Sequence, residues 1–370
     1  MISEVHRSLA GLLITAVLAA CAAPGDEPTI SPTAGPTAAP TTTASPAATE
    51  VVLMTHDSFA ISDAVLGAFR EQYGAEVRVL TAGDAGSMVN QAILTREAPL
   101  ADVLFGVDST FLSRALDADI FESYRPPAID QVDPSLRLDN AQSRVTPIDY
   151  GDVCLNYDRS AFTADEPAPK LLEELTDTRY RGQLVVENPA TSSPGLAFLL
   201  ATVARFGEAG DYTWVDYWAG LRDNGVLAVS GWEEAYYEHF SGGAGEGDRP
   251  IVVSYATSPV AEVVFADPRP EEAPTGVVTD GCFRQIEFAG VLAGTRRAEI
   301  ARRLVDFMLS PDFQADIPLN MFVFPVTDVE LPADFVEHAA KVPGPISMDP
   351  AQIDANREGW IEEWTNVVIR

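Results

Sequence analysis

VVLMTHDS, residues 51–58, joins four apolar residues directly to a polar tail. A short apolar run bounded by polar residues is typical of a buried strand. The segment that follows, residues 61–73, carries apolar side chains at helical spacing, at Val65, Leu66 and Phe69. A buried strand that leads into an amphipathic helix is the repeating unit of an α/β sheet. This part of the chain therefore predicts an α/β fold.

The same alternation of apolar runs and helical patterns continues along the chain. Strands that alternate with helices pair mostly in parallel, through right-handed crossovers. Because the pattern recurs later with different spacing, we expect two mostly parallel sheets, each flanked by helices. The expected strands are residues 76–80, 102–105, 184–186 and 251–254, and the expected helices are residues 87–95, 110–116, 195–206 and 298–308.

Two segments that lie far apart in the sequence, residues 147–157 and 285–292, also read as strands. In the first, Val153, Leu155 and Tyr157 alternate with other residues, as in a strand with one buried face. We interpret both segments as hinge strands that cross between two lobes. The expected layout is lobe 1 in residues 51–147 and 283–330, lobe 2 in residues 148–282, and a C-terminal helical segment in residues 331–370.

The first residues predict an export signal. Arg7 is followed by an uncharged run, residues 8–20, that is too short to span a bilayer. The run ends in Leu18-Ala19-Ala20-Cys21, which resembles the lipobox of bacterial lipoproteins. This implies cleavage after residue 20 and a lipid on Cys21; an ordinary secretory signal with an incidental cysteine is the alternative. We expect a protein anchored by lipid to the outer face of the cytoplasmic membrane, with the Thr-, Pro- and Ala-rich residues 21–50 as a tether.

The charge of the chain restricts its partners. The sequence has 24 Lys and Arg against 55 Asp and Glu, a formal net charge of −31. Such a chain repels nucleic acid and anionic membrane surfaces. We therefore expect that it does not bind nucleic acid and that it contacts the membrane only through the lipid anchor. A cationic ligand is compatible with this charge, although solubility alone would also explain it. We expect a monomer.

Motifs of common enzymes are absent from the sequence. It contains no Gly-x-Ser-x-Gly, no His-Glu-x-x-His, no Walker loop and no Gly-x-Gly-x-x-Gly. Only four histidines occur in the chain. We therefore expect a protein that is not an enzyme and that uses no cofactor and no metal.

Polar residues follow several of the expected strands. In an α/β sheet, ligands bind beyond the carboxyl ends of the strands. Free amides at a helix start, with hydroxyl groups beside them, form a site for a phosphate or carboxylate, although helix capping alone explains each residue equally well. The candidates at these positions are Asp57 or Ser58, with His56 before them, then Asp108, and then Ser192 or Ser193 before Pro194.

Aromatic residues occur at similar positions. Their faces stack on planar rings and attract cations, so beside acidic residues they would suit a flat, positively charged molecule. Core packing is the alternative for each of them. The candidates are Tyr150, Trp232, Tyr255 and Phe322.

Several of these segments resemble the thiamine-binding proteins, solute-binding subunits of ABC importers with a type II periplasmic-binding fold. The resemblance is colinear from about residue 51 to the end, and its motifs include Asp57-Ser58-Phe59, Asp149-Tyr150-Gly151, Thr191-Ser192-Ser193-Pro194-Gly195-Leu196, Gly231-Trp232-Glu233-Glu234-Ala235-Tyr236, Ser254-Tyr255-Ala256-Thr257-Ser258-Pro259 and Trp360-Ile361-Glu362-Glu363-Trp364. It implies capture of thiamine or a thiamine phosphate between two lobes, and delivery to an ABC permease and its ATPase. It also places Asp108, Ser192, Trp232 and Tyr255 in the site.

The sequence departs from that family pattern at three aromatic positions. His56 stands where the family has Tyr, Phe322 where it has Trp, and Ala261 where it has a second Tyr. A ferric-iron receptor of the same fold is an alternative, since His56, Tyr255 and the pair Tyr236-Tyr237 could be metal ligands. A secreted hydrolase that uses Ser192 is the second alternative.

Two cysteines remain after Cys21. Cys154 and Cys282 lie in or beside the expected crossing strands. Because thiols outside the cytoplasm tend to oxidise, we predict a disulfide between them; two free buried thiols are the alternative.

Overall fold

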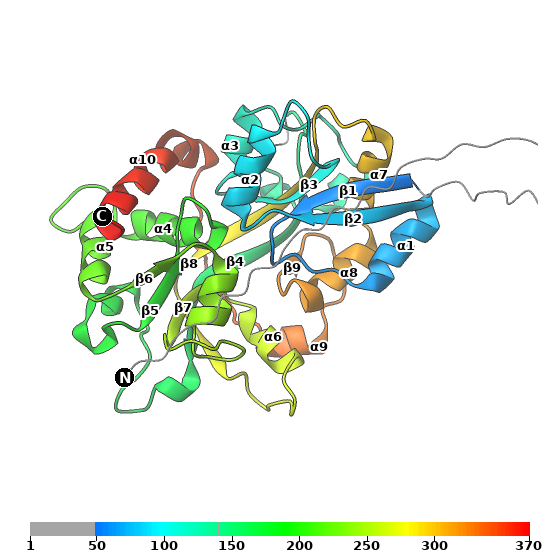
Figure 1. Cartoon of the computed structure of the whole chain (residues 1–370). Helices are drawn as coiled ribbons and strands as arrows, with labels where there is room; N and C mark the ends of the chain where they lie inside the picture. Colours follow the sequence, from blue (N-terminus) through cyan, green and yellow to red (C-terminus); the bar gives the residue numbers. More distant parts are fainter. Residues whose placement is uncertain (1–48, 140) are drawn as a thin grey trace, which may run out of the picture. The chain divides into compact units, whose positions relative to one another are not determined.

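In the computed structural model, which describes residues 49–139 and 141–370, the strands hydrogen-bond into one mixed sheet with helices packed against it (Figure 1). The strand order is β2-β1-β3-β8-β4-β7-β5-β6, and the short β9 pairs with β4. The strands are β1 (Thr49–Thr55), β2 (Ala75–Thr81), β3 (Val103–Asp108), β4 (Thr146–Asp158), β5 (Leu184–Glu187), β6 (Leu227–Val229), β7 (Ile251–Tyr255), β8 (Thr275–Val291) and β9 (Phe324–Pro325).

Parallel pairing occurs at both ends of the sheet. β1 pairs in parallel with β2 and β3, and β5 pairs in parallel with β6 and β7. Each parallel group follows from an alternation of strand and helix, as the sequence predicted. The predicted α/β fold is therefore confirmed.

The two parallel groups are joined by β4 and β8, which pair antiparallel from Thr146↔Ala289 to Asp158↔Thr275. β3 pairs with the C-terminal part of β8, and β7 pairs with the C-terminal part of β4. β4 has 13 residues and β8 has 17, so each is long enough to run from one group to the other. The predicted crossing strands are thus present, and they make the two expected sheets continuous. The lobe boundaries stay a prediction.

β8 begins ten residues before the strand expected at 285–292. The pairing of β4 with β8 shifts register between Val153 and Leu155, and Gly281 on β8 has a φ of +73°. An irregularity of this kind interrupts the two-residue alternation of side chains. The N-terminal part of β8 was therefore invisible to a search for strand periodicity.

The helices of the described residues are α1 (Asp63–Tyr73), α2 (Ala85–Leu94), α3 (Leu112–Asp117), α4 (Ser193–Phe206), α5 (Trp214–Asp223), α6 (Ser258–Val264), α7 (Ala298–Met308), α8 (Pro311–Asn320), α9 (Ala333–His338) and α10 (Pro350–Val368). Helical spacing placed five of them, α1, α2, α3, α4 and α7, close to these positions, whereas α5, α6 and α8 were not expected. α4 starts as predicted, with the Ser192 hydroxyl accepting from the Gly195 amide and Pro194 in the first turn.

Asp57 and Ser58, for which the sequence left helix capping open, do not cap α1. The cap is Ser62, whose hydroxyl accepts from the Val65 amide at 3.4 Å, and not Asp57 or Ser58. Residues 56–62, between β1 and α1, form a loop. Asp57 and Ser58 are therefore available for other contacts.

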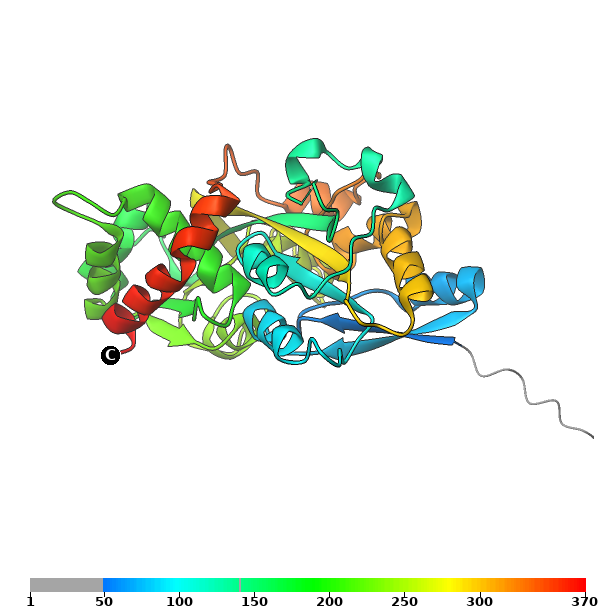
Figure 2. The ribbon, with the colours of Figure 1, turned by 90° about the horizontal axis from the view of Figure 1, so that it is seen from above.

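The C-terminal helix α10 packs against both α3 and α5 (Figure 2). The Arg357 guanidinium donates to the Ser113 hydroxyl at 2.7 Å, and the Trp364 ring meets Trp218 edge-on at 5.6 Å. Since α3 follows β3 and α5 precedes β6, this helix connects the two parallel groups of strands a second time.

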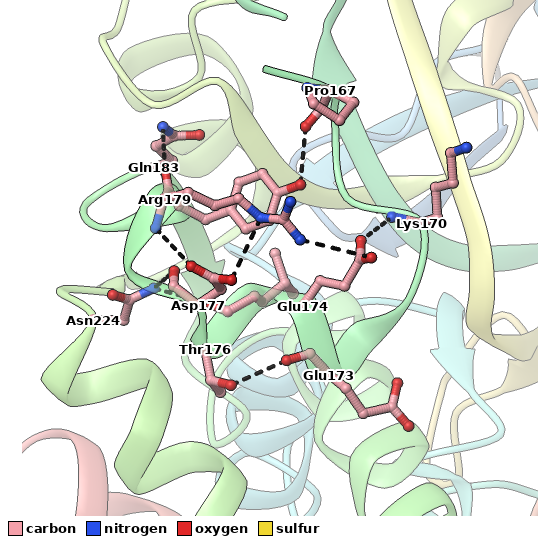
Figure 3. A network of polar contacts seen from close by, with 11 residues as sticks. Pro167, Lys170, Glu173, Glu174, Thr176, Asp177, Arg179, Gln183 and Asn224 are labelled. Atoms are coloured by element: carbon pink, nitrogen blue, oxygen red, sulfur yellow. Dashed lines mark hydrogen bonds and ion pairs between the residues drawn. The ribbon is translucent and has the colours of Figure 1, made fainter. Parts of the chain in front are cut away.

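Two further features fix the part of the chain between β4 and β8. Cys154 on β4 and Cys282 on β8 form the predicted disulfide, across 128 residues of sequence. Between β4 and β5, a network of polar contacts holds two short 3-10 turns, and Asn224 donates to the carbonyl oxygens of Leu175 and Asp177, both at 2.8 Å (Figure 3).

The expected signal segment, Cys21 and the tether up to residue 48 lie outside the described residues; β1 already includes residues 49 and 50. Among the helices of the described part, none combines the length and apolar character that crossing a membrane requires.

Candidate functional site

A cavity of about 590 Å³ opens where loops from both parallel groups of strands meet. Its walls come from the loop after β1, the π-helical turn η6 (Glu234–His239) with the residues before it, the β7–α6 connection, β8, and the segment after α8. The carboxyl ends of β1 and β7 thus face one space, as expected for an α/β ligand site. The expected site residues that line it are His56, Asp57, Ser58, Trp232, Tyr255 and Phe322.

The other expected residues, Asp108, Tyr150, Ser192 and Ser193, do not line this cavity. Tyr150 is covered on both faces, with the Phe324 ring stacked at 5.3 Å and the Arg284 guanidinium 4.8 Å from the ring centroid. Ser192 is fully buried and caps α4. These two side chains therefore have structural partners.

Asp108 lies fully buried at the end of β3. Its carboxylate accepts from the Thr110 amide at 2.9 Å and from the hydroxyl groups of Thr110 and Ser193. Burial raises the pKa of Asp108 to about 6, although the hydrogen bonds from Ser193 and Thr110 oppose that shift. Ser193 is thus engaged by a carboxylate of the protein itself.

The start of α4, where the sequence suggested an anion site, is occupied by a second carboxylate, that of Asp84. Asp84 accepts from the Ser193 amide at 3.3 Å and from the Trp232 amide at 2.9 Å. Burial raises the pKa of Asp84, and the hydrogen bonds that it accepts lower it in part. An anion at this helix start is therefore already supplied by the protein.

His56 and Glu287 form an ion pair at the cavity wall. The His56 Nε2 lies 3.6 Å from the Glu287 Oε2, and its Nδ1 is 2.9 Å from the Ser58 hydroxyl. Burial lowers the pKa of His56, but the charge of Glu287, with Asp84 and Asp57, outweighs it and raises the pKa above the ordinary value. Gly106 leaves the space that the His56 imidazole occupies, because a Cβ at position 106 would lie 2.3 Å from the ring.

Asp149 faces Glu287 across the β4–β8 ladder and is fully buried. Burial and the negative charge of Glu287 raise the pKa of Asp149 well above its usual range. Two carboxyl groups this close are most stable when they share one proton. Asp149 therefore favours its protonated form beside Glu287.

An aromatic wall faces these charges. The Trp232 indole stacks on the Tyr236 ring at 4.9 Å, and its Nε1 donates to the Ser254 hydroxyl at 2.9 Å. The Tyr236 hydroxyl donates to the Glu262 carboxylate at 2.6 Å. Trp232 is thus held in a fixed orientation on one face while it also lines the cavity.

Tyr255 and Phe322 complete this wall. The Tyr255 hydroxyl donates to the Gln285 side chain at 3.2 Å, and the ring lies so close to Gly151 that a Cβ there would come within 2.9 Å of it. Phe322 meets the largely exposed Phe265 edge-on at 5.4 Å. Phe265, which lies one helical turn after Ala261, adds an aromatic ring to the cavity lining.

Several lining residues were missed by the sequence analysis: Glu233, Glu262, Phe265 and Glu287. Tyr236 and Tyr237, which also line the cavity, were considered only as ligands of a ferric ion. Most of them lie on helical turns, where no rule for strand ends applies. Glu287 could have been recognised from the sequence. It is a charged residue between Ile286 and Phe288 in a strand with buried character, and charged residues are rarely buried without a specific partner.

No group of three or more His, Cys, Asp or Glu side chains within residues 49–139 and 141–370 is placed to hold a metal ion.

Comparison with known proteins places the chain among exported binding proteins. Residues 98–343 match a family model described as bacterial extracellular solute-binding protein. The thiamine-binding periplasmic protein of Salmonella typhimurium is 30% identical over 335 residues, which cover 88% of this chain and 96% of that protein. The protein of the same name from Escherichia coli is 29% identical, over 88% of this chain and 95% of its own length.

Solved structures agree on the fold. A structure described as a periplasmic thiamin binding protein matches with a TM-score of 0.75 and 27% identity, over 87% of this chain and 96% of that one. Iron-bound HitA from Pseudomonas aeruginosa matches with a TM-score of 0.63 and 19% identity, over 86% and 99% of the two chains, which shows a shared fold. This chain belongs to the bacterial extracellular solute-binding protein family.

Proposed function

We propose that this protein is the solute-binding subunit of an ABC importer and captures thiamine in the cavity between Trp232 and Glu287. One observation carries the proposal: a fixed indole, stacked on Tyr236, stands in the same cavity as the carboxylates of Glu262 and Glu287. The names of the relatives from Salmonella typhimurium and Escherichia coli support it independently.

The chemistry of thiamine fits these walls. Thiamine joins a flat aminopyrimidine to a thiazolium ring with a fixed positive charge. An aromatic face attracts such a ring by stacking and by the cation–π interaction, and carboxylates offset its charge. In this proposal Trp232 and Tyr255 contact the rings, and Glu287 lies on the side of the positive charge.

A ferric-iron site is less well supported by the same residues. Ferric receptors bind iron through deprotonated tyrosines. Burial, together with the negative charge of nearby carboxylates, raises the pKa of Tyr236, Tyr237 and Tyr255 above the usual value. The Tyr236 and Tyr255 hydroxyl groups also donate to Glu262 and Gln285, so an iron site would have to break both hydrogen bonds.

A hydrolase that uses Ser192 is also less well supported. The Ser192 hydroxyl is fully buried, caps α4 and does not line the cavity. A nucleophile needs access to substrate and a neighbouring base. Ser192 has a sufficient structural role as a helix cap.

The proposed cellular setting follows from the relatives that are named periplasmic. The protein is exported, holds its ligand outside the cytoplasmic membrane as a monomer, and passes it to a permease driven by an ATPase. The lipid anchor at Cys21 belongs to this proposal. Metabolic labelling with palmitate should mark the wild type and spare Cys21→Ser; label on both proteins would refute the anchor.

The ligand can be identified directly. Native mass spectrometry of the protein purified from its host, followed by thermal-shift measurements with thiamine, ferric citrate and a generic ester, should show the mass of a thiamine compound and a rise in Tm with thiamine only. An iron-loaded, coloured protein stabilised by ferric citrate would overturn the proposal. So would ester hydrolysis that Ser192→Ala abolishes.

A further inference from the structure

We infer that Phe265 is a further ligand-contacting residue, and that it closes the mouth of the cavity together with Phe322 and so slows the release of the ligand. This inference rests on the proposed function. It concerns how long the ligand stays bound rather than which ligand is bound.

The two phenylalanine rings come from separate parts of the chain. Phe265 directly follows α6, the helix after β7, whereas Phe322 lies in the segment between α8 and β9. Both side chains line the cavity, and their rings meet edge-on, with centroids 5.4 Å apart and planes at 74°. α6 lies beside both α8 and α9 (Figure 1). The ring pair therefore connects two walls of the cavity.

The exposure of Phe265 places it at the opening of the cavity. Its side chain is 72% exposed, whereas His56 and Ser258, which also line the cavity, are only 8% and 6% exposed. The lining thus runs from a buried floor to an exposed rim, and Phe265 lies on that rim. A flat ligand that lies against the free face of this ring removes apolar surface from water and gains a ring contact. Phe265 therefore contributes more to the complex than to the free protein.

The backbone of Phe322 is held in an unusual conformation. Its φ is +57°, in the left-handed region, and its amide donates to the Ile317 carbonyl oxygen at 3.2 Å where α8 ends. A residue in this conformation just after a helix is usually glycine, because a side chain adds steric strain there. Strained residues cluster at ligand sites, where the surrounding structure holds them in place. The strain supports a role in ligand binding for the ring that Phe322 presents to Phe265.

An ion pair ties the segment that carries Phe265 to α9. Arg269, four residues after Phe265, donates from its Nη1 to the Asp334 carboxylate at 3.1 Å. Phe335, the next residue on α9, meets Phe324 of β9 edge-on at 5.0 Å. The Arg269–Asp334 pair is partly exposed, and exposed ion pairs contribute little to stability. The contact therefore holds the mouth closed but allows it to open.

This arrangement predicts an effect on the rate of dissociation. The ligand leaves only after the two rings separate, and removal of the Phe265 ring also takes one contact from the bound state. Entry into the open form requires neither the ring pair nor the ion pair. Among variants of one binding site, differences in affinity come mostly from the dissociation rate. Loss of the Phe265 ring should therefore act on release and leave association nearly unchanged.

The test measures the release of radiolabelled thiamine from the mature protein after a chase with excess unlabelled thiamine. Phe265→Ala should release thiamine about tenfold faster, near the lower end of the range for loss of one stacking ring, with an association rate changed by less than about twofold. Phe265→Tyr keeps the ring and should release thiamine at close to the wild-type rate. The matched control is Leu94→Ala, at a side chain that is 84% exposed and outside the cavity; it should leave the rate unchanged.

A double-mutant cycle tests whether the two rings act as a pair. Phe322→Ala should also speed release, and the variant with both substitutions should release thiamine more slowly than the product of the two single effects, because each substitution already breaks the same ring contact. Effects that multiply in full would contradict the pairing.

The outcomes separate the two proposals. Release at the wild-type rate in Phe265→Ala, or a loss of affinity that lies in the association rate, would overturn the inference and leave thiamine binding intact. Equal acceleration by Leu94→Ala would also overturn it, because the effect would then not depend on the mouth of the cavity. Failure of the wild type to bind thiamine would instead reject the proposed function itself.

Discussion

The Asp84 carboxylate accepts a hydrogen bond from the Trp232 backbone amide at 2.9 Å, although 148 residues separate them in the sequence. The same carboxylate caps α2 through the Ala85 amide and accepts from the Ser193 amide. One side chain thus connects the starts of α2 and α4 with the residue whose indole lines the cavity. The position of Trp232 is therefore set by a contact between distant parts of the chain.

Asp84→Ala removes these three hydrogen bonds. Loss of a charge-assisted contact together with a helix cap should lower the free energy of unfolding by about 1–3 kcal/mol. Thiamine affinity should fall as well, because the Trp232 backbone loses its support. Urea unfolding and calorimetry measure the two effects. Asp84→Asn, which keeps one acceptor oxygen, should recover part of both; full stability and affinity in Asp84→Ala would contradict the role of this carboxylate.

Trp232→Ala should weaken thiamine binding by roughly ten- to hundred-fold, the effect expected for loss of one stacking aromatic residue. Trp232→Phe should retain much of the affinity because a ring remains on Tyr236. Tyr212→Ala is the matched control, since Tyr212 is 48% exposed and lies outside the cavity. Titration calorimetry of the three variants decides the matter: a loss in Tyr212→Ala equal to that in Trp232→Ala would show a general effect on stability.

The local elements followed from the sequence because they depend on short-range periodicity. The strand at 251–254 and the helix at 298–308 were found almost residue for residue. The N-terminal part of β8 was not found, since Gly281 and the register shift beside it break the alternation. Long-range pairing across β4 and β8 carries no local signal.

The cavity was predictable to the extent that it lies at strand ends. His56 and Tyr255 follow β1 and end β7, so the rule for α/β sheets located them. Asp108 and Ser193 also stand at a strand end and a helix start, yet they bond to each other beside the cavity. The sequence identified both as polar groups at these positions, but only the fold shows that the Ser193 hydroxyl and the Asp108 carboxylate form a hydrogen bond with each other.

Asp108 makes stability depend on pH. Burial raises its pKa to about 6, so its contribution to stability is present at low pH and is lost as the pH rises through 6. The shift corresponds to about 3 kcal/mol between the protonated and ionised forms. As the pH rises from 4 to 7, the free energy of unfolding of Asp108→Asn should therefore increase relative to that of the wild type.

Urea unfolding of the wild type and Asp108→Asn at several pH values tests this pH dependence. Hydrogen bonds lost in the variant change its free energy of unfolding by the same amount at every pH, so they do not affect the slope. Asp133→Asn is a control that should show no slope in this range, because hydrogen bonds from Ser135 lower the pKa of the exposed Asp133, so its contribution to stability changes only at lower pH. A difference between wild type and Asp108→Asn that stays constant from pH 4 to pH 7 would disprove the assignment.

The disulfide between Cys154 and Cys282 should stabilise the fold by restricting the unfolded chain. Replacing both residues by Ala is expected to lower the free energy of unfolding by about 2–5 kcal/mol. Wild-type protein with dithiothreitol should unfold like the double variant, which separates loss of the bond from loss of the sulfur atoms. Identical unfolding curves of the wild type with and without reductant would show that the bond adds no stability.

Thiamine binding itself is tested most directly by calorimetric titration of the purified mature protein with thiamine, after removal of bound ligand by partial unfolding and refolding. The account predicts saturable heat with one thiamine per chain, and a marked loss of affinity in Trp232→Ala. No heat, together with an unchanged Tm at saturating thiamine, would contradict it.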